Sequence, residues 1–393
     1  METLDVDRVA ARVRGVELSG IRVIFDMAAK MPDVIRLEAG EPDFKTPQHI
    51  CEAAQKAMKE GRTRYTTSRG IPELRAAIAS KAKKENNIDA DPDEEIVVTA
   101  GGSCAVYLAI NTVVEEGDEV LIPDPTWPHY EACVKLAGGR PLTYPLKEEL
   151  GFSFDIDEIK KMITDRTKMI VVATPSNPTG GVIPLKDLKA LADVAINHDI
   201  LILSDEVYEK IVYDGEKHYS IASLSGMKDR CITVNSFSKT YAMTGWRLGY
   251  AIAPKDIATN MAKLNLFVNS CPSSVSQEAG LAALTGPQDD VVMMLNEYSK
   301  RRRVIVDGLS RIEGFTINPP KGAFYAFPKI SKLNYSSWDL CMLLLKEGRV
   351  ATVPGSAFGA CGEGYIRISY ANSVEKIKEA ISRIEETLSK IRR

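Results

Sequence analysis

The sequence predicts an α/β fold with a large domain, built on a mostly parallel sheet flanked by helices, and a smaller α+β domain. Short runs rich in Val and Ile recur through the middle of the chain, amphipathic helical patterns separate them, and the pattern changes after Pro287. Continuous apolar runs suit strands buried on both faces of a parallel sheet. Regular alternation of such strands with helices is typical of α/β proteins.

The alternating block defines the elements of the large domain. The predicted strands are 95–100, 119–123, 168–173, 200–204, 231–235 and 248–253. The predicted helices are 103–115, 127–137, 155–164, 184–198 and 256–267.

After Pro287 the pattern indicates a separate α+β unit. It contains a long amphipathic helix, two short strands and two further helices, at 288–312, 323–327, 365–370, 337–347 and 373–391. The first 35 or so residues also lie outside the alternating block. We therefore expect a large domain over 45–287 and a discontinuous small domain made of 1–44 and 288–393.

The composition is that of an ordinary soluble globular protein: of 393 residues, 45% are hydrophobic and 26% charged. With 53 acidic and 50 basic residues, the net charge of −3 excludes a generally basic nucleic-acid binder. No run approaches the roughly 18 apolar residues that would span a membrane, and the first residues lack the apolar core of a secretory signal. The seven cysteines form no C-x-x-C pair and, with four scattered histidines, indicate no metal site. A cytoplasmic protein with reduced thiols is expected.

Several common catalytic motifs are absent. There is no G-x-x-x-x-G-K-[ST] phosphate loop, and no G-x-G-x-x-G follows a strand. G-x-S-x-G and H-E-x-x-H are also missing. These absences weigh against hydrolases and nucleotide-dependent oxidoreductases.

Polar residues instead follow the predicted strands, where open parallel sheets build their sites. The turn TAGGSCA (99–105) begins a helix near Ser103. The free backbone N–H groups at the start of that helix would suit an anion. Asn177 follows another strand in the turn ATPSNPTGG, and Asp205 ends the strand after that. A carboxylate in such a crevice normally requires a cationic partner.

The segment VNSFSKTYAMTGWRLGY (234–250) carries the strongest signal. A strand ends in Ser236 and Ser238, Lys239 follows, and Arg247 lies eight residues further on. A desolvated lysine near other cations has a depressed pKa, and its neutral amine is the form that makes Schiff bases. Arg247 and the two hydroxyls would suit a phosphate monoester.

This segment resembles the pyridoxal-phosphate lysine signature of class I/II aminotransferases, which are aspartate aminotransferase-like enzymes of fold type I. The resemblance covers nearly the whole chain and implies a seven-stranded large-domain sheet. The supporting motifs are GEPDF (40–44), RYTTSRGIPELR (64–75), AGG (100–102), DPTWPHY (124–130), NPTG (177–180), SDEVY (204–208), VPGSAFG (353–359) and YIRISYA (365–371).

The resemblance implies roles for residues around the cofactor. Lys239 resembles the lysine that forms the Schiff base and then moves the substrate proton. Asp205 is similar to the carboxylate that pairs with the pyridinium nitrogen. Tyr208 and Asn177 resemble the pair that hydrogen-bonds the ring oxygen, and Trp127 resembles the aromatic residue that stacks on the ring. The implied phosphate ligands are Gly102, Ser103, Ser236, Ser238 and Arg247, with Tyr65 contributed by the neighbouring subunit of a homodimer with shared active sites.

The resemblance also implies how the substrate is held. Arg367 resembles the arginine that binds the α-carboxylate, and Gly40 would offer a backbone N–H, with Trp127 and Asn177 beside the substrate. The implied reaction moves an amino group between an L-amino acid and a 2-oxo acid, and aspartate with 2-oxoglutarate is favoured. An aromatic-amino-acid or kynurenine-type transaminase is the first alternative, and a C–S lyase is a more distant one.

The residue that recognises the distal group of the substrate is open. The position of Ser103 carries lysine in some similar bacterial enzymes, and the stretch NSCPSSVSQ (269–277) contains no arginine. Arg22 and Arg69 are the candidates, although each could equally be a surface or interface residue. A non-catalytic regulator of the same fold is disfavoured because such proteins usually append a DNA-binding domain, for which the chain leaves no room.

Overall fold

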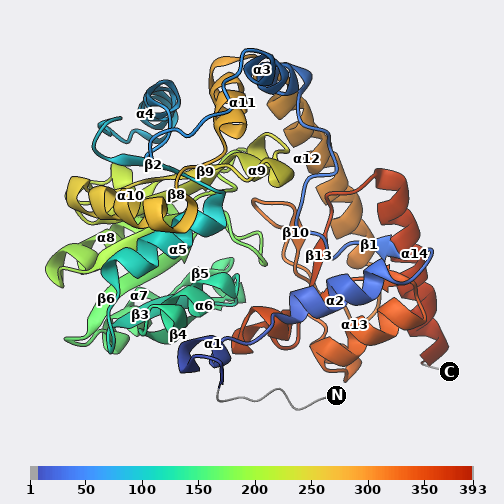
Figure 1. The fold of residues 1–393 in the computed structure, drawn as a ribbon. Helices are drawn as coiled ribbons and strands as arrows, with labels where there is room; N and C mark the ends of the chain where they lie inside the picture. Colours follow the sequence, from blue (N-terminus) through green and yellow to red (C-terminus); the bar gives the residue numbers. More distant parts are fainter. Residues whose placement is uncertain (1–7, 392–393) are drawn as a thin grey trace.

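The computed structural model describes residues 8–391 and has the expected α/β architecture (Figure 1). Its large sheet has eight strands in the order β2-β9-β8-β7-β6-β3-β4-β5. The pairings from β4 through β3, β6 and β7 to β8 are parallel, whereas β9 is antiparallel to both of its neighbours. The strands are β2 (Ile96–Thr99), β3 (Glu119–Asp124), β4 (Arg140–Lys147), β5 (Ser153–Phe154), β6 (Thr167–Ala173), β7 (Leu201–Asp205), β8 (Cys231–Ser236) and β9 (Gly249–Ile252).

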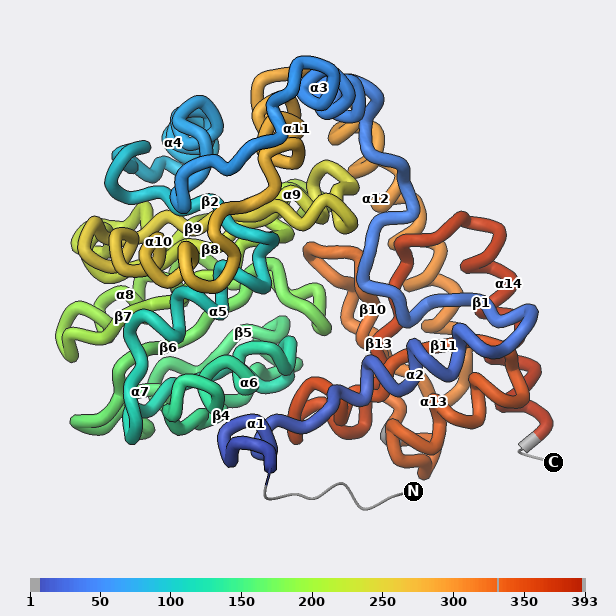
Figure 2. Tube along the Cα trace, in the orientation of Figure 1, coloured from blue at the N-terminus to red at the C-terminus, as the bar shows by residue number. Residues whose placement is uncertain are grey.

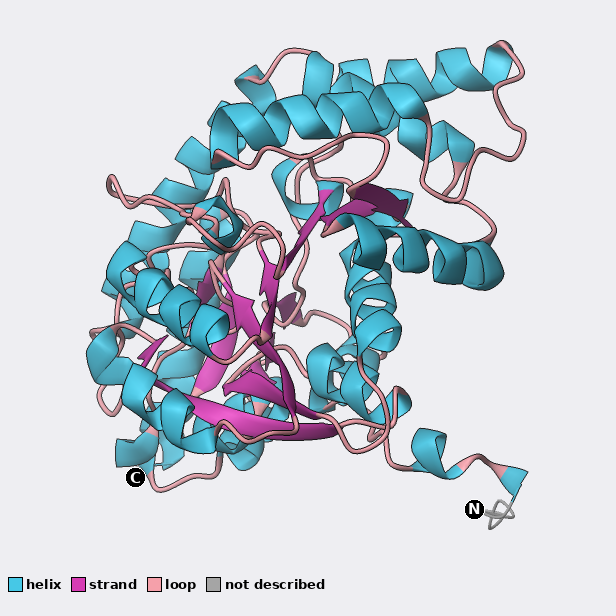
Figure 3. Ribbon diagram, turned by 90° about the vertical axis from the view of Figure 1, so that its left-hand side faces the viewer, coloured by secondary structure: helices cyan, strands magenta, loops and turns pink. Residues whose placement is uncertain are grey.

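Helices cover both faces of this sheet (Figure 3). Successive residues of a strand point to opposite faces, and the packing follows this rule. Met169 and Val171 of β6 pack with α5 (Gly102–Val113), α6 (His129–Leu136) and α10 (Lys255–Asn269). Ile170 and Val172 pack with α7 (Ile156–Met162) and α8 (Leu185–Asn197). The continuous apolar runs therefore arise because both faces of each central strand are buried.

A third group of helices packs at the β2 end of the sheet, at the top of Figure 1. It consists of α3 (Gln48–Lys59), α4 (Pro72–Asn86) and α11 (Ser274–Thr285). Their apolar residues share one core with Ile96 and Val98 of β2.

The chain after the large sheet, together with residues 35–37, forms another core and two small sheets, and residues 208–213 and Ala242 also pack into this core. One has the order β10-β13-β12, and the other pairs β1 with β11. The strands are β1 (Ile35–Arg36), β10 (Tyr325–Ala326), β11 (Val350–Ala351), β12 (Val353–Pro354) and β13 (Ile366–Ser369). The helices of this part are α2 (Gly20–Ala29), α12 (Asp289–Leu309), α13 (Ser337–Lys346) and α14 (Val374–Ile391). Two short helices lie elsewhere in the chain: α1 (Ala11–Arg14) precedes α2, and α9 (Phe237–Thr240) directly follows β8.

The two ends of the chain lie together in this second unit. β1 pairs in parallel with β11, which joins Ile35 to Val350 and Arg36 to Ala351. In Figure 2 the blue N-terminal segment runs beside the orange and red C-terminal elements. Ile24 and Ala28 of α2 share a small core with Leu345 and Ala351.

All six predicted strand runs and all five predicted helices of the alternating block are present, with shifts of a few residues at their ends. The sequence pattern missed β4, whose segment RPLTYPLK contains two prolines and is only partly buried. Proline weakens a strand pattern because it lacks a backbone donor. With β4 the sheet has the seven strands that the resemblance implies, and the two-residue β5, paired with β4 at the edge, is an eighth strand that was not expected. Within residues 8–391 no helix is long and apolar enough to cross a membrane.

The first prediction concerns Gly249, which lets β9 lie against the turn that begins α5. A Cβ atom there would lie 2.6 Å from the Gly102 nitrogen and 2.9 Å from the Asn235 oxygen. Because these are backbone atoms, they cannot move aside easily, and Gly249→Ala should lower the free energy of unfolding by about 1–3 kcal/mol. Chemical denaturation measures this change. The control is Gly245→Ala, since no atom lies within 4 Å of a Cβ there; equal effects of the two variants would contradict the prediction.

Candidate active site

One cavity gathers most of the residues that the sequence singled out. It is lined by Ile21, Gly40, Gly102, Ser103, Trp127, Tyr130, Ala173, Pro175, Asn177, Asp205, Val207, Tyr208, Ser236, Ser238, Lys239, Arg247, Tyr325 and Arg367. The strand order explains the gathering. Trp127 follows β3, Asn177 follows β6, Asp205 ends β7 and Lys239 follows β8, and these four strands are adjacent and parallel. Their carboxyl ends therefore meet at one edge of the sheet.

Lys239 lies in the short helix α9, which the side chain of Ser236 caps by accepting from the Ser238 N–H. Its ammonium donates to the carbonyl oxygen of Gly40, so a residue of the N-terminal segment contacts the end of β8. Burial lowers the pKa of Lys239 to about 8, and the nearby charges of Arg367 and Arg247 act in the same direction. A larger fraction of this amine is thus neutral near physiological pH than of an exposed lysine.

Asp205 is a buried carboxylate whose near partners are neutral. Its oxygens accept from the hydroxyl of Tyr130 at 2.6 Å and from the N–H of Val207 at 3.2 Å. Burial raises the pKa of Asp205 to about 6, although both hydrogen bonds oppose that shift. A cation placed beside this carboxylate would lower the pKa again.

Hydroxyl and guanidinium groups gather beside the start of α5. Ser236 Oγ donates to Ser238 Oγ at 2.9 Å, and Arg247 Nη2 donates to Ser103 Oγ at 3.2 Å. Gly101 has φ +89°, and a Cβ there would lie 2.5 Å from Arg247 Nη2. The glycine therefore keeps open a cradle that combines hydroxyls, a guanidinium and the start of a twelve-residue helix, a combination that suits a phosphate.

Arg367, on β13, is buried at the opposite side of the cavity. It donates to Asn177 Oδ1 at 2.9 Å and to the Glu38 carbonyl at 2.5 Å. Its guanidinium lies 4.5 Å from the ring centroid of Tyr325. Its Nε has no hydrogen-bond partner.

Three of the predicted residues lie elsewhere. Tyr65 is 89% exposed, and Arg22 forms an exposed ion pair with Asp26 at 3.0 Å on its own helix. Arg69 donates to the Glu94 carbonyl and to Thr259.

The sequence interpretation gave no role to Tyr130, Tyr325 or Ile21, although all three line the cavity. Tyr325 hydrogen-bonds Tyr208 through their hydroxyls at 2.7 Å. Tyr130 follows Trp127 by three residues, and side chains at that spacing share a face at a helix start. This spacing was the available signal for Tyr130, whereas Tyr325 lies in an apolar run without distinguishing features.

Comparison with known proteins identifies the family. Residues 32–384 match the family described as "Aminotransferase class I and II". The chain belongs to the class I and II aminotransferases. This aminotransferase is 48% identical to the aspartate aminotransferase of Pyrococcus abyssi, with 95% of this chain and 96% of that protein covered. It is 46% identical to aromatic-amino-acid aminotransferase 2 of Thermococcus litoralis, over 96% and 97% of the two chains.

A solved structure of similar architecture is the Thermus thermophilus aspartate aminotransferase with maleate. The TM-score is 0.93 at 37% identity, and the match covers 96% of this chain and 99% of the other.

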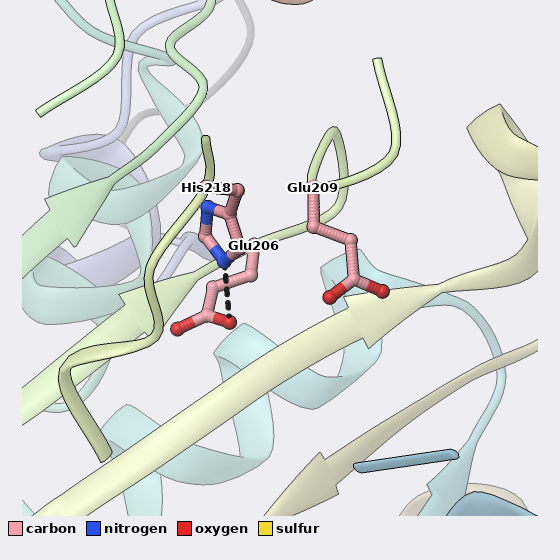
Figure 4. Close-up of side chains that lie close together, drawn as sticks. All are labelled: Glu206, Glu209 and His218. Atoms are coloured by element: carbon pink, nitrogen blue, oxygen red, sulfur yellow. Dashed lines mark hydrogen bonds and ion pairs between the residues drawn. The ribbon is translucent and has the colours of Figure 1, made fainter. Parts of the chain in front are cut away.

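A second cluster of titratable side chains lies behind the cavity in the aminotransferase, where Glu206, Glu209 and His218 approach one another (Figure 4). Glu206 accepts from His218 Nε2 at 2.9 Å and from the hydroxyls of Ser204 and Ser220.

The carboxylate of Glu209 accepts from the Lys81 ammonium and from Asn86. Burial would raise the pKa of Glu209, but Lys81 and His218 outweigh it and lower the pKa to about 2. Because a protein ammonium already supplies the positive charge, we interpret this cluster as structural, and it anchors the segment that follows Asp205.

The second prediction concerns the protonation of Lys239 in protein from which any bound small molecule has been removed. Because its pKa is lowered to about 8, its reaction with acetic anhydride should rise with pH and level off above about pH 9. Exposed lysines, with an ordinary pKa of about 10.4, should continue to gain reactivity beyond that pH. Competitive isotope labelling with mass spectrometry of the Lys239 peptide measures the profile. A Lys239 midpoint in the range of exposed lysines would contradict the prediction.

Proposed function

We propose that this enzyme transfers an amino group between an L-amino acid and a 2-oxo acid with pyridoxal 5'-phosphate bound in the cavity. One observation carries the proposal. Lys239, Arg247 and Arg367 all line the cavity, and within residues 8–391 the hydrogen bonds of these three cations go to carbonyl, hydroxyl and amide oxygens, not to carboxylates. Cations that line a cavity and hydrogen-bond to no carboxylate suit a ligand that carries a phosphate and a carboxylate.

The residues fit this cofactor at each of its functional groups. The cradle beside α5 suits the phosphate, and the neutral fraction of Lys239 suits the aldehyde. Asp205 lacks a cationic partner, which a protonated ring nitrogen would provide. Tyr208 and Asn177 would face the ring oxygen, and Trp127 would cover one ring face. The proposed phosphate ligands are Gly102, Ser103, Ser236, Ser238 and Arg247.

The side chains that line the cavity would then have separate roles in the reaction. When bound, the cofactor takes up the amino group and withdraws electrons from the substrate Cα–H bond. Arg367 would bind the α-carboxylate and orient the Cα–H bond, with the Gly40 N–H beside it. Lys239 would accept the Cα proton and return one later, and a pKa near the working pH suits both steps. Asp205 would hold a proton on the ring nitrogen.

We propose a homodimer with shared active sites. Tyr65 is 89% exposed, and Leu266, Phe267 and Val268 of α10 are 50%, 80% and 47% exposed. Exposed large apolar residues in a group are typical of interaction surfaces. A partner subunit would bring its own copy of Tyr65 to the phosphate. The seven free cysteines support a reducing, cytoplasmic location.

We also propose that the chain divides into a large domain, 45–287, and a discontinuous small domain, 1–44 with 288–393. The pairing of β1 with β11 and the core shared by α12, α13 and α14 support this division. That core also includes Tyr208, Ile211, Tyr213 and Ala242 of the large domain, which connect the two parts. Residues 1–7 and 392–393 lie outside the described part.

Aspartate and 2-oxoglutarate are the proposed substrates. Relatives named aspartate aminotransferase are 48% and 44% identical to this chain. The aromatic alternative has the support of one relative and one solved structure named aromatic aminotransferase, and of the apolar wall residues Ile21 and Tyr325.

The third prediction tests the function. Wild-type protein mixed with pyridoxal phosphate should turn yellow, and L-aspartate alone should shift its absorption band. Lys239→Ala should lose the band and at least about a thousandfold in the rate of glutamate formation, because no amine remains to move the proton. Absorption spectra and a coupled assay measure both. A colourless wild type, or Lys239→Ala with an unchanged spectrum, would refute the proposal. Release of ammonia and pyruvate without an oxo acid would indicate a lyase instead.

The fourth prediction concerns Arg22 as the residue for the distal carboxylate. Its neighbour Ile21 lines the cavity, and an exposed pair such as Arg22 with Asp26 is weak enough to be exchanged for a substrate. Arg22→Ala should raise KM for aspartate about tenfold and KM for phenylalanine less than twofold. Steady-state kinetics with both donors measures this difference. Arg69→Ala is the matched control and should change neither KM. If Arg22→Ala changes KM for both donors equally, Arg22 does not bind the distal carboxylate.

A further inference from the structure

Trp127 is held by the two aromatic rings that follow it in the sequence. The ring of His129 stacks on the indole with centroids 4.4 Å apart and planes inclined by 29°. The ring of Tyr130 meets the indole edge-on at 5.7 Å and 87°. Trp127 and Tyr130 line the cavity, whereas His129 is not among its lining residues. The histidine therefore supports the indole without taking part in the cavity wall.

His129 has a second contact that leads to the phosphate cradle. Its Nε2 lies 2.9 Å from the carbonyl oxygen of Ser103. Because a carbonyl only accepts, Nε2 must carry a proton and donate it. The hydroxyl of the same Ser103 accepts from Arg247. One imidazole thus connects the proposed ring-stacking residue to the proposed phosphate-binding turn.

The imidazole suits this task because it stays neutral. Burial lowers the pKa of His129, and the hydrogen bond to Ser103 only partly opposes that shift. A neutral ring stacks on indole without bringing another positive charge close to Arg247. Cys133 Sγ lies 3.5 Å from the same Nε2.

We propose that His129 is a positioning residue for the cofactor, which acts by fixing the plane of Trp127 through ring stacking. This inference rests on the proposed function, since it concerns the binding of pyridoxal phosphate. Without the stacked ring the indole gains rotational freedom that cofactor binding must remove. An aromatic pair of this kind affects binding by about 2- to 10-fold.

Two substitutions separate the two contacts of His129. His129→Phe keeps a ring against Trp127 and loses the donor to Ser103. His129→Gln keeps a donor of similar reach and loses the ring. We expect the Phe variant to bind pyridoxal phosphate within about twofold of wild type and to keep its visible circular dichroism. The Gln variant should bind about fivefold more weakly, with a diminished dichroic band, because the cofactor ring loses its fixed neighbour.

A double-mutant cycle distinguishes positioning from a general loss of structure. In a Trp127→Leu background, His129→Gln should weaken cofactor binding by less than about twofold further, since the indole it supports is gone. The cycle needs only the Gln variant, so it holds even if the Phe variant folds poorly. Equilibrium titration of the apoprotein, followed by absorbance and dichroism, measures all four affinities.

Three outcomes would overturn the inference: wild-type affinity in His129→Gln, an equal loss in His129→Phe, or a full fivefold loss in the Trp127→Leu background. Failure of the proposed function is visible separately. In that case wild type and Lys239→Ala would give the same titration, whatever the variants of His129 do.

Discussion

Like charges facing one cavity are the constraint on which the rest of the site depends. Burial lowers the pKa of both Lys239 and Arg367, and the charge of Arg367 lowers the pKa of Lys239 further. The protein compensates them with carbonyl oxygens and aromatic faces: the Gly40 and Glu38 carbonyls, and the rings of Tyr208 and Tyr325. These groups stabilise a cation and, unlike carboxylates, leave its charge available to an anionic ligand.

The large sheet provides the rigid side of this arrangement. Asp205 ends β7, and Trp127, Asn177 and Lys239 lie within a few residues of the ends of the neighbouring parallel strands, so strand pairing brings all four to one edge of the sheet. Behind them, Glu206 is held by two serine hydroxyls and His218. Such a network fixes the backbone directly after Asp205. The second unit contributes Arg367 and Tyr325, and the hydrogen bond between Arg367 and Asn177 joins the two sides.

Apolar periodicity was sufficient to predict the central strands, because burial on both faces leaves a strong signal in each. It was insufficient for β4, which is half exposed and contains prolines. Lys239 and Asp205 could be found because charged residues at the ends of buried strands are unusual, and Arg247 because it lies in the same segment as Lys239. Tyr325 could not, since a buried tyrosine looks like any core aromatic until its hydroxyl has a partner, and for Tyr130 the three-residue spacing from Trp127 was the one available signal. For Arg22 the sequence could not show the ion pair with Asp26, which its proposed role requires it to exchange for the substrate.

The parallel pairing of β1 with β11 has a consequence for the order of events during synthesis. Residues 35–36 leave the ribosome more than 300 residues before their partners at 350–351, whereas the large sheet is complete once β9 has been made. The apolar residues of α2 thus lack the partners of their core until α13 and β11 emerge. Contacts between distant segments slow folding and leave apolar surface exposed meanwhile. Arg367 comes later still, so the nascent chain carries Lys239 long before it carries the arginine of the opposite wall.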